Sequence, residues 1–145
     1  MSGIIGSIYS KSGLVNRLGP DTTVSSFKGA QALPNNKIPV ESQLVDAGGN
    51  QNANGTYTCP ATGNYMCMLS CMQDGTSGGG NLAVGLSKNG SWVGAHAYTI
   101  AGQYERVAMQ NVIPCSFGDA LFWMPWDGYR TVQSGYTNIT FYLLN

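Results

Sequence analysis

Residues 55–67 read Gly55-Thr-Tyr-Thr-Cys-Pro-Ala-Thr-Gly63-Asn-Tyr65-Met-Cys67, and this stretch decides the fold class of the chain. A short run that contains Tyr57 ends at Cys59-Pro60, and a second run with an aromatic residue begins after Gly63. Proline and glycine interrupt strands and begin turns. The stretch therefore predicts two strands joined by a sharp corner.

The sequence on both sides of this corner is also typical of β-structure. From Ser26 onward, short runs rich in β-branched and aromatic residues alternate with Gly, Asn, Asp and Pro. We predict strands over 26–32, 39–46, 55–59, 64–73, 81–88, 91–98, 105–113, 119–126 and 136–144. Asn89-Gly90 predicts a tight hairpin, because this pair favours positive φ at both turn centres. No window has a convincing helical period.

Four segments carry a resemblance to a known family. They are Gly55 to Tyr65, Lys88-Asn89-Gly90, Gly118-Asp119 with the strand after it, and the terminal 137–145. Together they resemble the globular head of complement's q subcomponent, the sister family of the tumour necrosis factors. The resemblance implies an all-β, ten-stranded jelly-roll sandwich over residues 26–145, which works as a homotrimer.

Two residues depart from the pattern of that family. Phe141 stands where the family often has glycine, and Cys67 stands where it often has phenylalanine. The two changes in volume have opposite signs. They compensate each other if the two side chains are neighbours in the core.

The composition favours a permanent assembly. Charged residues make up 10% of the chain and the formal net charge is zero, whereas a typical soluble domain has about 25% charged residues. So few charges do not cover the surface of a lone monomer or keep its copies apart. The absence of a basic run argues against nucleic acid as a partner, and no segment reaches the length of a membrane span.

The predicted strand at 64–73 locates a possible subunit interface. A period of two places Tyr65, Cys67, Leu69 and Cys71 on one face, and Met66, Met68 and Met72 on the other. A strand with one solvated face should alternate apolar with polar residues, so a second subunit, or alternatively a loop or the rim of the other sheet, covers the methionine face. The trimer interface that we expect consists of Met66, Met68, Met72, Phe122, Phe141 and Tyr142.

Residues 1–25 form a separate segment with its own expected role. They are rich in Gly and Ser and contain only short apolar pieces, so the segment cannot bury enough surface to fold alone. We expect an anchoring arm held by a neighbouring chain or a larger particle, and its opening residues resemble the start of some marine and cyanobacterial phage virion proteins. The expected anchoring residues are Ile4, Ile5, Ile8, Tyr9, Leu14 and Val15.

The four cysteines are expected to be reduced, buried thiols. The N-terminus lacks the basic region of a secretion signal, and disulfides are rare in proteins that are not exported. On one strand, Cys67 and Cys71 lie about 13 Å apart at about 3.3 Å per residue, whereas a bridge needs Cα atoms within about 7 Å. Cys59 and Cys115 each stand beside a proline at a predicted strand end.

The sequence offers no enzyme, cofactor or metal site. His96 is the only histidine, no Gly-x-Ser-x-Gly elbow occurs, and no Asp-x-Asp pair supports calcium. Most of the aromatic run from Phe117 to Tyr129 is assigned to packing. Trp126, Tyr129 and Arg130 flank a predicted turn and are candidate exposed contacts, for a sugar or for another virion protein.

These expectations combine into one functional hypothesis. The chain is expected to be a phage virion structural protein, made in the host cytoplasm, whose trimeric head decorates and cements the capsid through contacts with the major capsid protein or another virion protein. A receptor-recognition module at a tail fibre tip is the alternative. A secreted signalling ligand is a third class, which the missing signal peptide disfavours.

Overall fold

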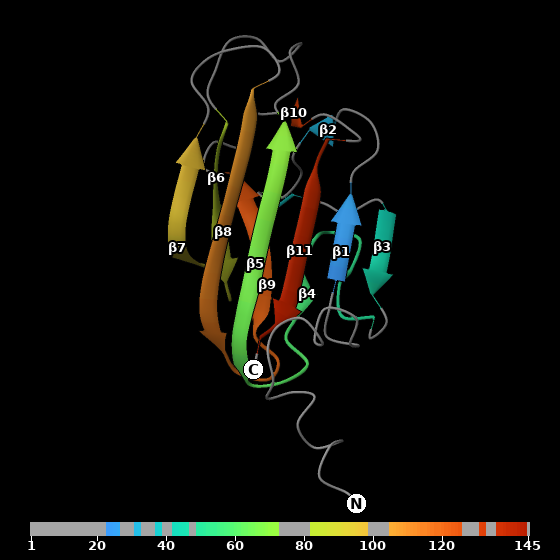
Figure 1. Cartoon of the computed structure of the whole chain (residues 1–145), viewed down its shortest axis with the longest axis vertical. Helices are drawn as coiled ribbons and strands as arrows, with labels where there is room; N and C mark the ends of the chain where they lie inside the picture. The colour runs from blue at the N-terminus through green and yellow to red at the C-terminus, as the bar shows by residue number, and fades with distance from the viewer. Residues whose placement is uncertain are drawn as a thin grey trace, which may run out of the picture.

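The computed structural model describes residues 23–26, 31–32, 37–38, 42–46, 49–72, 82–98, 105–125, 131–132 and 136–144. Every regular element within these ranges is a β-strand, and the ranges contain no helix. The strands pair in antiparallel fashion into a five-stranded sheet, a four-stranded sheet and a two-stranded pair (Figure 1).

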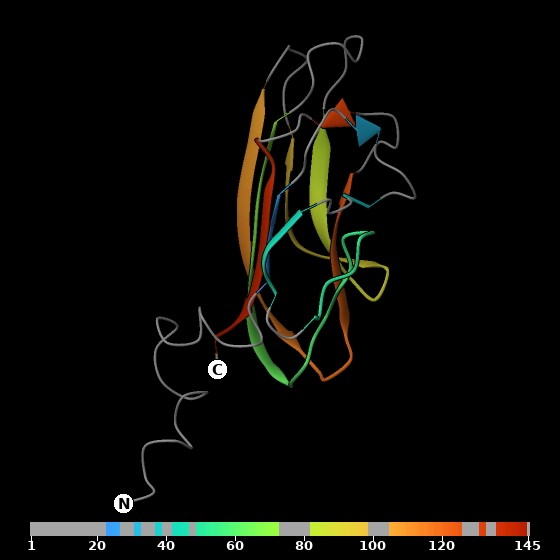
Figure 2. The same ribbon diagram turned by 90° about the vertical axis from the view of Figure 1, so that its right-hand side faces the viewer.

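The five-stranded sheet has the order β3-β1-β11-β5-β8. Its strands are β1 (Thr23–Ser26), β3 (Ser42–Asp46), β5 (Gly63–Met72), β8 (Arg106–Cys115) and β11 (Asn138–Leu143). The four-stranded sheet, of order β4-β9-β6-β7, contains β4 (Tyr57–Thr58), β6 (Ala83–Lys88), β7 (Ser91–Tyr98) and β9 (Ala120–Pro125). The remaining pair joins β2 (Gln31–Ala32) to β10 (Thr131–Val132). Figure 2 shows the two larger sheets as two facing layers.

The core lies between these layers because strand periodicity points alternate side chains inward. On β5, Tyr65, Cys67, Leu69 and Cys71 are buried while the methionines between them are only half-buried, as the sequence predicts. Inward side chains from the other sheet, with Trp123 the largest, complete the core.

Tyr57 connects the two sheets through aromatic contacts. Its ring stacks on Phe141 of β11 with centroids 5.2 Å apart, and it meets the edge of Tyr65 at 6.0 Å. All three rings are fully buried. Aromatic pairs of this geometry contribute about 0.5–1.5 kcal/mol beyond their area burial, so the corner motif of residues 55–67 supplies two of the rings that join the layers.

The two ends of the sandwich differ. One end, named the corner end here, contains the corner at 60–62, the turn at 116–119 and the hairpin turn at 89–90. Gly63 opposes Cys115 there, and Lys88 opposes Leu121. The opposite end, named the far end, holds Met72 and Arg106, which oppose each other, together with the last residue of β7, Tyr98, and the start of β11.

The prediction of an all-β jelly-roll sandwich is confirmed, with differences in strand boundaries. The run at 26–32 was expected to be one strand, but β1 ends at Ser26 and β2 comprises only 31–32. The two belong to different sheets, since β1 pairs with β11 and β2 with β10. β1 also begins at Thr23, inside the segment assigned to the arm. The Asn89-Gly90 hairpin is confirmed by φ values of 53° and 86°.

Candidate interaction surface

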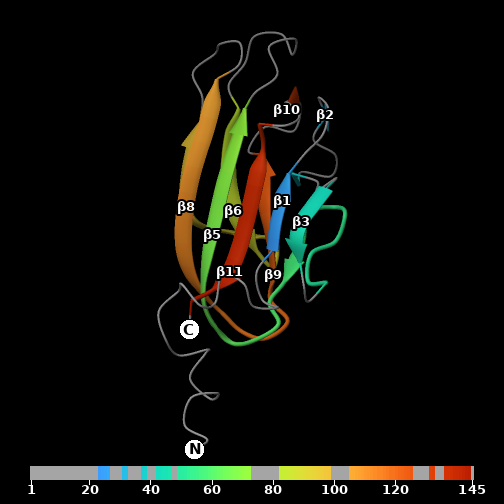
Figure 3. The same cartoon turned by 45° about the vertical axis from the view of Figure 1, so that its right-hand side comes forward.

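The outer face of β11, β5 and β8 is a broad sheet surface that contains a single charged side chain at the far end. Its residues are fixed by register, because Met68 opposes Thr140 on one side and Gln110 on the other. This surface, named the methionine face here, consists of Asn64, Met66, Met68, Ser70, Met72, Arg106, Ala108, Gln110, Val112, Pro114, Asn138, Thr140 and Tyr142. Arg106 is the charged member. Figure 3 shows the three strands side by side.

A shallow groove of about 520 Å³ crosses the middle of the methionine face. Side chains from all three strands line it, among them Met68, Ala108 and Thr140. Val112, farther along β8, is 54% exposed. Soluble monomers seldom leave a broad uncharged and partly apolar sheet face in water. The face therefore has the character of a contact surface.

The predicted interface residues fall in three different parts of the structure. Met66, Met68, Met72 and Tyr142 lie together on the methionine face, as register requires. Phe141 points the other way and is fully buried against Tyr57, so it is not available to a second chain, and its assignment to the interface is wrong. The neighbouring position, Tyr142, takes the outward direction because side chains alternate, and 9% of it is exposed.

Phe122 also lies apart from the methionines. It belongs to β9 of the other sheet, where its neighbours Leu121 and Trp123 point into the core. Phe122 is therefore on the opposite outer surface, covered by Lys37, whose Nζ lies 4.3 Å from the ring centroid. The same Nζ donates a hydrogen bond to Thr56 Oγ1 at 3.0 Å. Phe122 cannot share one contact surface with Met66.

The alternation on β8 is a signal that the sequence reasoning did not use. Arg106, Ala108, Gln110, Val112 and Pro114 are exposed in succession, while the residues between them point inward. Because this outer row mixes apolar and polar types, only its pairing with the Met row on β5 identifies it as part of one surface.

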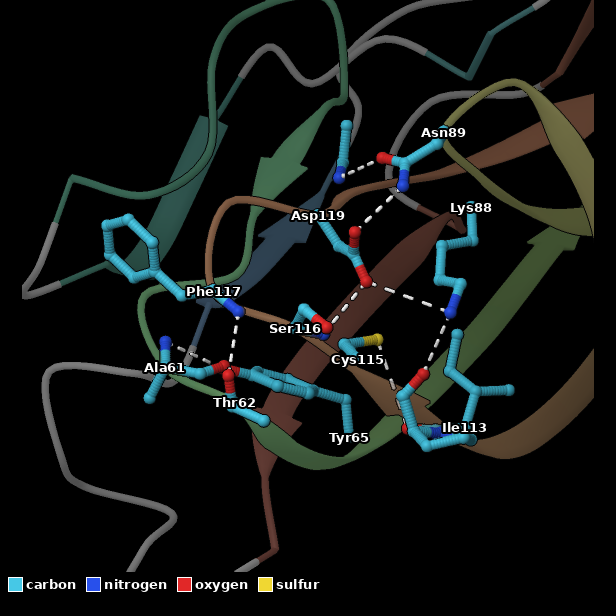
Figure 4. A network of polar contacts seen from close by, with 12 residues as sticks. Ala61, Thr62, Tyr65, Lys88, Asn89, Ile113, Cys115, Ser116, Phe117 and Asp119 are labelled. Atoms are coloured by element: carbon cyan, nitrogen blue, oxygen red, sulfur yellow. Dashed lines mark hydrogen bonds and ion pairs between the residues drawn. The ribbon is translucent and has the colours of Figure 1, made fainter.

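A polar network closes the corner end (Figure 4). Asp119 accepts hydrogen bonds from the Asn89 amide and from the Ser116 backbone N–H, each at 2.8 Å. The side-chain oxygen Oδ1 of Asn89 accepts in turn from the Ala120 backbone N–H at 2.8 Å. Lys88 Nζ donates to the Pro114 carbonyl at 3.0 Å and lies 3.7 Å from Asp119 Oδ2. The Ser116 and Asn89 hydrogen bonds hold the pKa of Asp119 below its usual range.

The four thiols are buried, as predicted, and are free in this structure. Burial raises the pKa of Cys71 to about 12 and raises that of Cys67 as well. Cys59 and Cys115 differ from these two because each thiol shifts the pKa of the other.

His96 belongs to an aromatic contact on the outside of the four-stranded sheet. Its ring lies 4.9 Å from that of Trp92, centroid to centroid. The two rings cover Gly85, where an added Cβ would collide with both. The only histidine of the chain thus packs with Trp92 over Gly85.

No group of three or more His, Cys, Asp or Glu side chains that could hold a metal ion occurs among the described residues. Within the same ranges, no helix is long and apolar enough to cross a membrane.

Two tyrosines project at the far end. Tyr98 ends β7 and is 72% exposed, and Tyr136 precedes β11 and is 53% exposed. Phe117, in the turn at the corner end, is exposed as well, although aromatic residues of this run were mostly assigned to packing. The proposed contacts Trp126, Tyr129 and Arg130 lie outside the described residues. So do all six arm residues, Ile4, Ile5, Ile8, Tyr9, Leu14 and Val15.

No family model and no curated protein matches the chain. Solved structures do match it. The globular domain of zebrafish complement 1qA protein is 15% identical, with a TM-score of 0.66, over 86% of this chain and 97% of that one. Murine APRIL is 12% identical with a TM-score of 0.64, over 85% of this chain and 99% of that one.

Eiger TNF from S. frugiperda is similar too, at 11% identity and a TM-score of 0.58, over 86% of this chain and 94% of that one. The matches span nearly the whole of each matched structure, so the chain has the fold of the complement 1q and tumour-necrosis-factor jelly rolls.

Proposed function

We propose that the chain is a bacteriophage virion structural protein, whose trimeric head decorates the capsid and stabilises the shell. The observation that carries the proposal is the methionine face, since a wide sheet surface whose only charge is Arg106 is suited to a permanent contact between subunits. Burying a methionine side chain contributes about 1.5–3 kcal/mol. Met66 and Met68 in each of three subunits therefore offer a substantial apolar contribution to assembly.

Three subunits are proposed because the sequence resembles the trimeric heads of complement's q subcomponent. The low charge of the whole chain supports a fixed oligomer independently. Methionine is suited to such a surface, because its flexible side chain fills irregular gaps between packed subunits.

The anchoring role is assigned to residues 1–22. β1 begins at Thr23, and Thr23 opposes Phe141, on the side of β11 that leads toward the corner end. The arm thus joins the head away from Tyr98 and Tyr136. In this arrangement the corner end faces the capsid and the far end points outward. The binding partner is the major capsid protein or another virion protein.

One observation favours the receptor-recognition alternative. The exposed Tyr98 and Tyr136 lie at the far end, where a module at a fibre tip would meet the host surface. Tyrosine is common at recognition surfaces because its ring packs and its hydroxyl hydrogen-bonds. This second candidate retains the trimer and the arm but moves the protein to the tail.

The test uses purified full-length protein, a variant that lacks residues 1–22, and capsids assembled without the protein. Full-length protein should bind these capsids and raise the temperature at which they fail, because a ligand of the assembled shell stabilises it by mass action. The truncated variant should remain a folded trimer and lose most of this binding.

Two results would contradict the proposal. Normal capsid binding by the truncated head would show that the arm is not the anchor. Full-length protein that ignores capsids but adheres to host cells would establish the fibre-tip alternative instead. Light scattering at micromolar concentration should report three chains, and a stable soluble monomer would exclude both candidates.

A further inference from the structure

At the corner end the chain crosses between the two larger sheets twice, and the two crossings lie side by side. The corner at 60–62 takes the chain from β4 in the four-stranded sheet to β5 in the five-stranded sheet. The turn at 116–119 takes it back, from β8 to β9. The two crossings run in opposite directions, and each begins immediately after a cysteine, Cys59 in the first and Cys115 in the second.

Backbone hydrogen bonds hold the two crossings together. The Cys59 N–H donates to the Asp119 carbonyl and the Gly118 N–H donates to the Cys59 carbonyl, both at 2.8 Å. Cys115 opposes Gly63 at the other end of the first corner. A further hydrogen bond joins the two crossings, because the Phe117 N–H donates to Thr62 Oγ1 at 3.0 Å. Cys59 thus contacts the second crossing, which begins after Cys115. Cys115 in turn lies beside the end of the first crossing, which begins after Cys59.

The two side chains meet in the interior. Both belong to the buried core, and the two thiols are close enough for each to shift the pKa of the other. The other cysteines are placed differently, since Cys67 opposes Asn111 and Cys71 opposes Val107 within the five-stranded sheet. Among the four, Cys59 and Cys115 are therefore the pair that joins one sheet to the other.

The surroundings make the two thiols unequal. The neighbouring Cys59 thiol and the Lys88 ammonium lower the pKa of Cys115. The Cys115 thiol and burial raise the pKa of Cys59. Cys115 also directly precedes Ser116, Phe117 and Gly118, which are exposed. Of the two buried thiols, Cys115 is accordingly the one that ionises more readily and stands next to exposed residues, so we expect it to attack first.

We propose that Cys59 and Cys115 form a redox pair, which closes into a disulfide between the two sheets when the protein meets a disulfide oxidant such as glutathione disulfide. The Cys115 thiol first loses its proton, and its sulfur attacks one sulfur of the oxidant. The S–S bond of the oxidant breaks, and one glutathione leaves as the thiolate.

Cys59 completes the exchange. It loses its proton and attacks the Cys115 sulfur of the mixed disulfide, which expels the second glutathione. Two electrons pass from the cysteines to the oxidant, and two glutathione thiols are the products. The new bond closes a long loop, from Cys59 to Cys115, and constraining a long loop restricts the unfolded chain strongly.

The experiment incubates the native full-length protein with glutathione disulfide, quenches it with acid and digests it for peptide mass mapping. We expect a linked pair of peptides containing Cys59 and Cys115, the loss of two titratable thiols from four, and a melting temperature several degrees higher than that of the reduced protein. Cys71→Ala is the matched control, because Cys71 is buried but opposes Val107, and this variant should still close the bond.

Two variants test the order of attack. Cys59→Ala should accumulate a stable glutathione adduct on Cys115, and Cys115→Ala should leave Cys59 unmodified. Four titratable thiols after treatment of the native protein, or a linked peptide that contains Cys67 or Cys71, would overturn the proposal. Peptide mass mapping of the native protein tests the Cys59–Cys115 bond even if a variant fails to fold.

Discussion

At the scale of single residues, Asp119 joins two turns of the corner end. Its carboxylate accepts from Asn89 of the hairpin turn and from Ser116 of its own turn at 116–119, and Lys88 lies nearby. The ion pair is at the surface, where such pairs contribute little. The hydrogen bonds to the ionised carboxylate are the main cause of its lowered pKa, because they favour the charged form.

Asp119 should therefore make stability depend on pH in the acid range. Its pKa in the folded protein is below the ordinary value of 3.8, so its contribution is complete above about pH 4 and disappears as pH falls through the lower folded pKa. We expect Asp119→Asn to lower the urea midpoint at pH 7 and to have a smaller effect at pH 3, below the ordinary pKa of 3.8. Glu105→Gln, outside this network, is the control. An equal effect of Asp119→Asn at both pH values would contradict this account.

Cys67 and Phe141 form a second residue-scale feature. They are direct register partners on β5 and β11, and both are fully buried. The two side chains are therefore neighbours in the core, as the expected compensation between their opposite changes in volume requires. A phenylalanine on β11 fills the space next to a small cysteine on β5.

A double-mutant cycle tests this compensation. Phe141→Gly should destabilise by at least about 3–5 kcal/mol, because it leaves a cavity beside Tyr57. Cys67→Phe alone should cost about 1–3 kcal/mol through overpacking. The double variant should be more stable than the sum of the two losses predicts, by about 0.5–3 kcal/mol. Strict additivity in denaturant unfolding would show that the two side chains pack independently.

At the scale of elements, β5 is the strand whose two faces have the most distinct roles. Its inward row builds the core and its outward row, Met66, Met68, Ser70 and Met72, forms the centre of the methionine face. The flanking outward rows of β11 and β8 contribute no carboxylate. A charge placed at the centre of this surface would lose its hydration when a second chain covers it.

Met68→Lys should accordingly separate the subunits without unfolding them. Met68 is only half-buried in one chain, so a lysine there remains solvated in the monomer. Light scattering should report monomers, while circular dichroism retains the β signal. Thr58→Lys, an exposed position on the edge strand β4, is the control and should leave the oligomer intact. A Met68→Lys protein that stays trimeric would place the subunit contact elsewhere.

The elements also show how far sequence reasoning extends. The corner at 55–67 and the alternation on β5 were predictable, because proline, glycine and a strict period of two are local signals. The methionine face as a whole was not, since it depends on β5 lying between β11 and β8. The error at Phe141 arose from assigning an aromatic residue to an interface without the register that points it inward. The pairing of Cys59 with Cys115 was hidden for the same reason, as it requires two distant corners to meet.

At the scale of the whole molecule, the sandwich has two unlike ends. The corner end is closed by hydrogen-bonded turns and receives the start of β1, while the far end displays Tyr98 and Tyr136. The proposed decoration role assigns the first end to the capsid and the second to solvent.

Changes at the far end should therefore spare capsid binding. The double variant Tyr98→Ala and Tyr136→Ala should bind capsids that lack the protein as tightly as the unmodified chain, because both side chains lie away from the arm. The 1–22 deletion is the matched comparison and should lose binding. A strong loss in the double tyrosine variant would place the capsid contact at the far end and reverse the proposed orientation.

The position of β11 has a consequence for biosynthesis. This last strand lies between β1 and β5, and it pairs Thr23 with Phe141 near the two ends of the chain. Ribosomes release a chain from its N-terminus onward at about 5–20 residues per second, so β1 and β5 have no shared neighbour until β11 emerges. The five-stranded sheet can close only after residues 138–143 have left the ribosome. Until then the nascent chain exposes unpaired strand edges, which makes prematurely terminated products prone to aggregation.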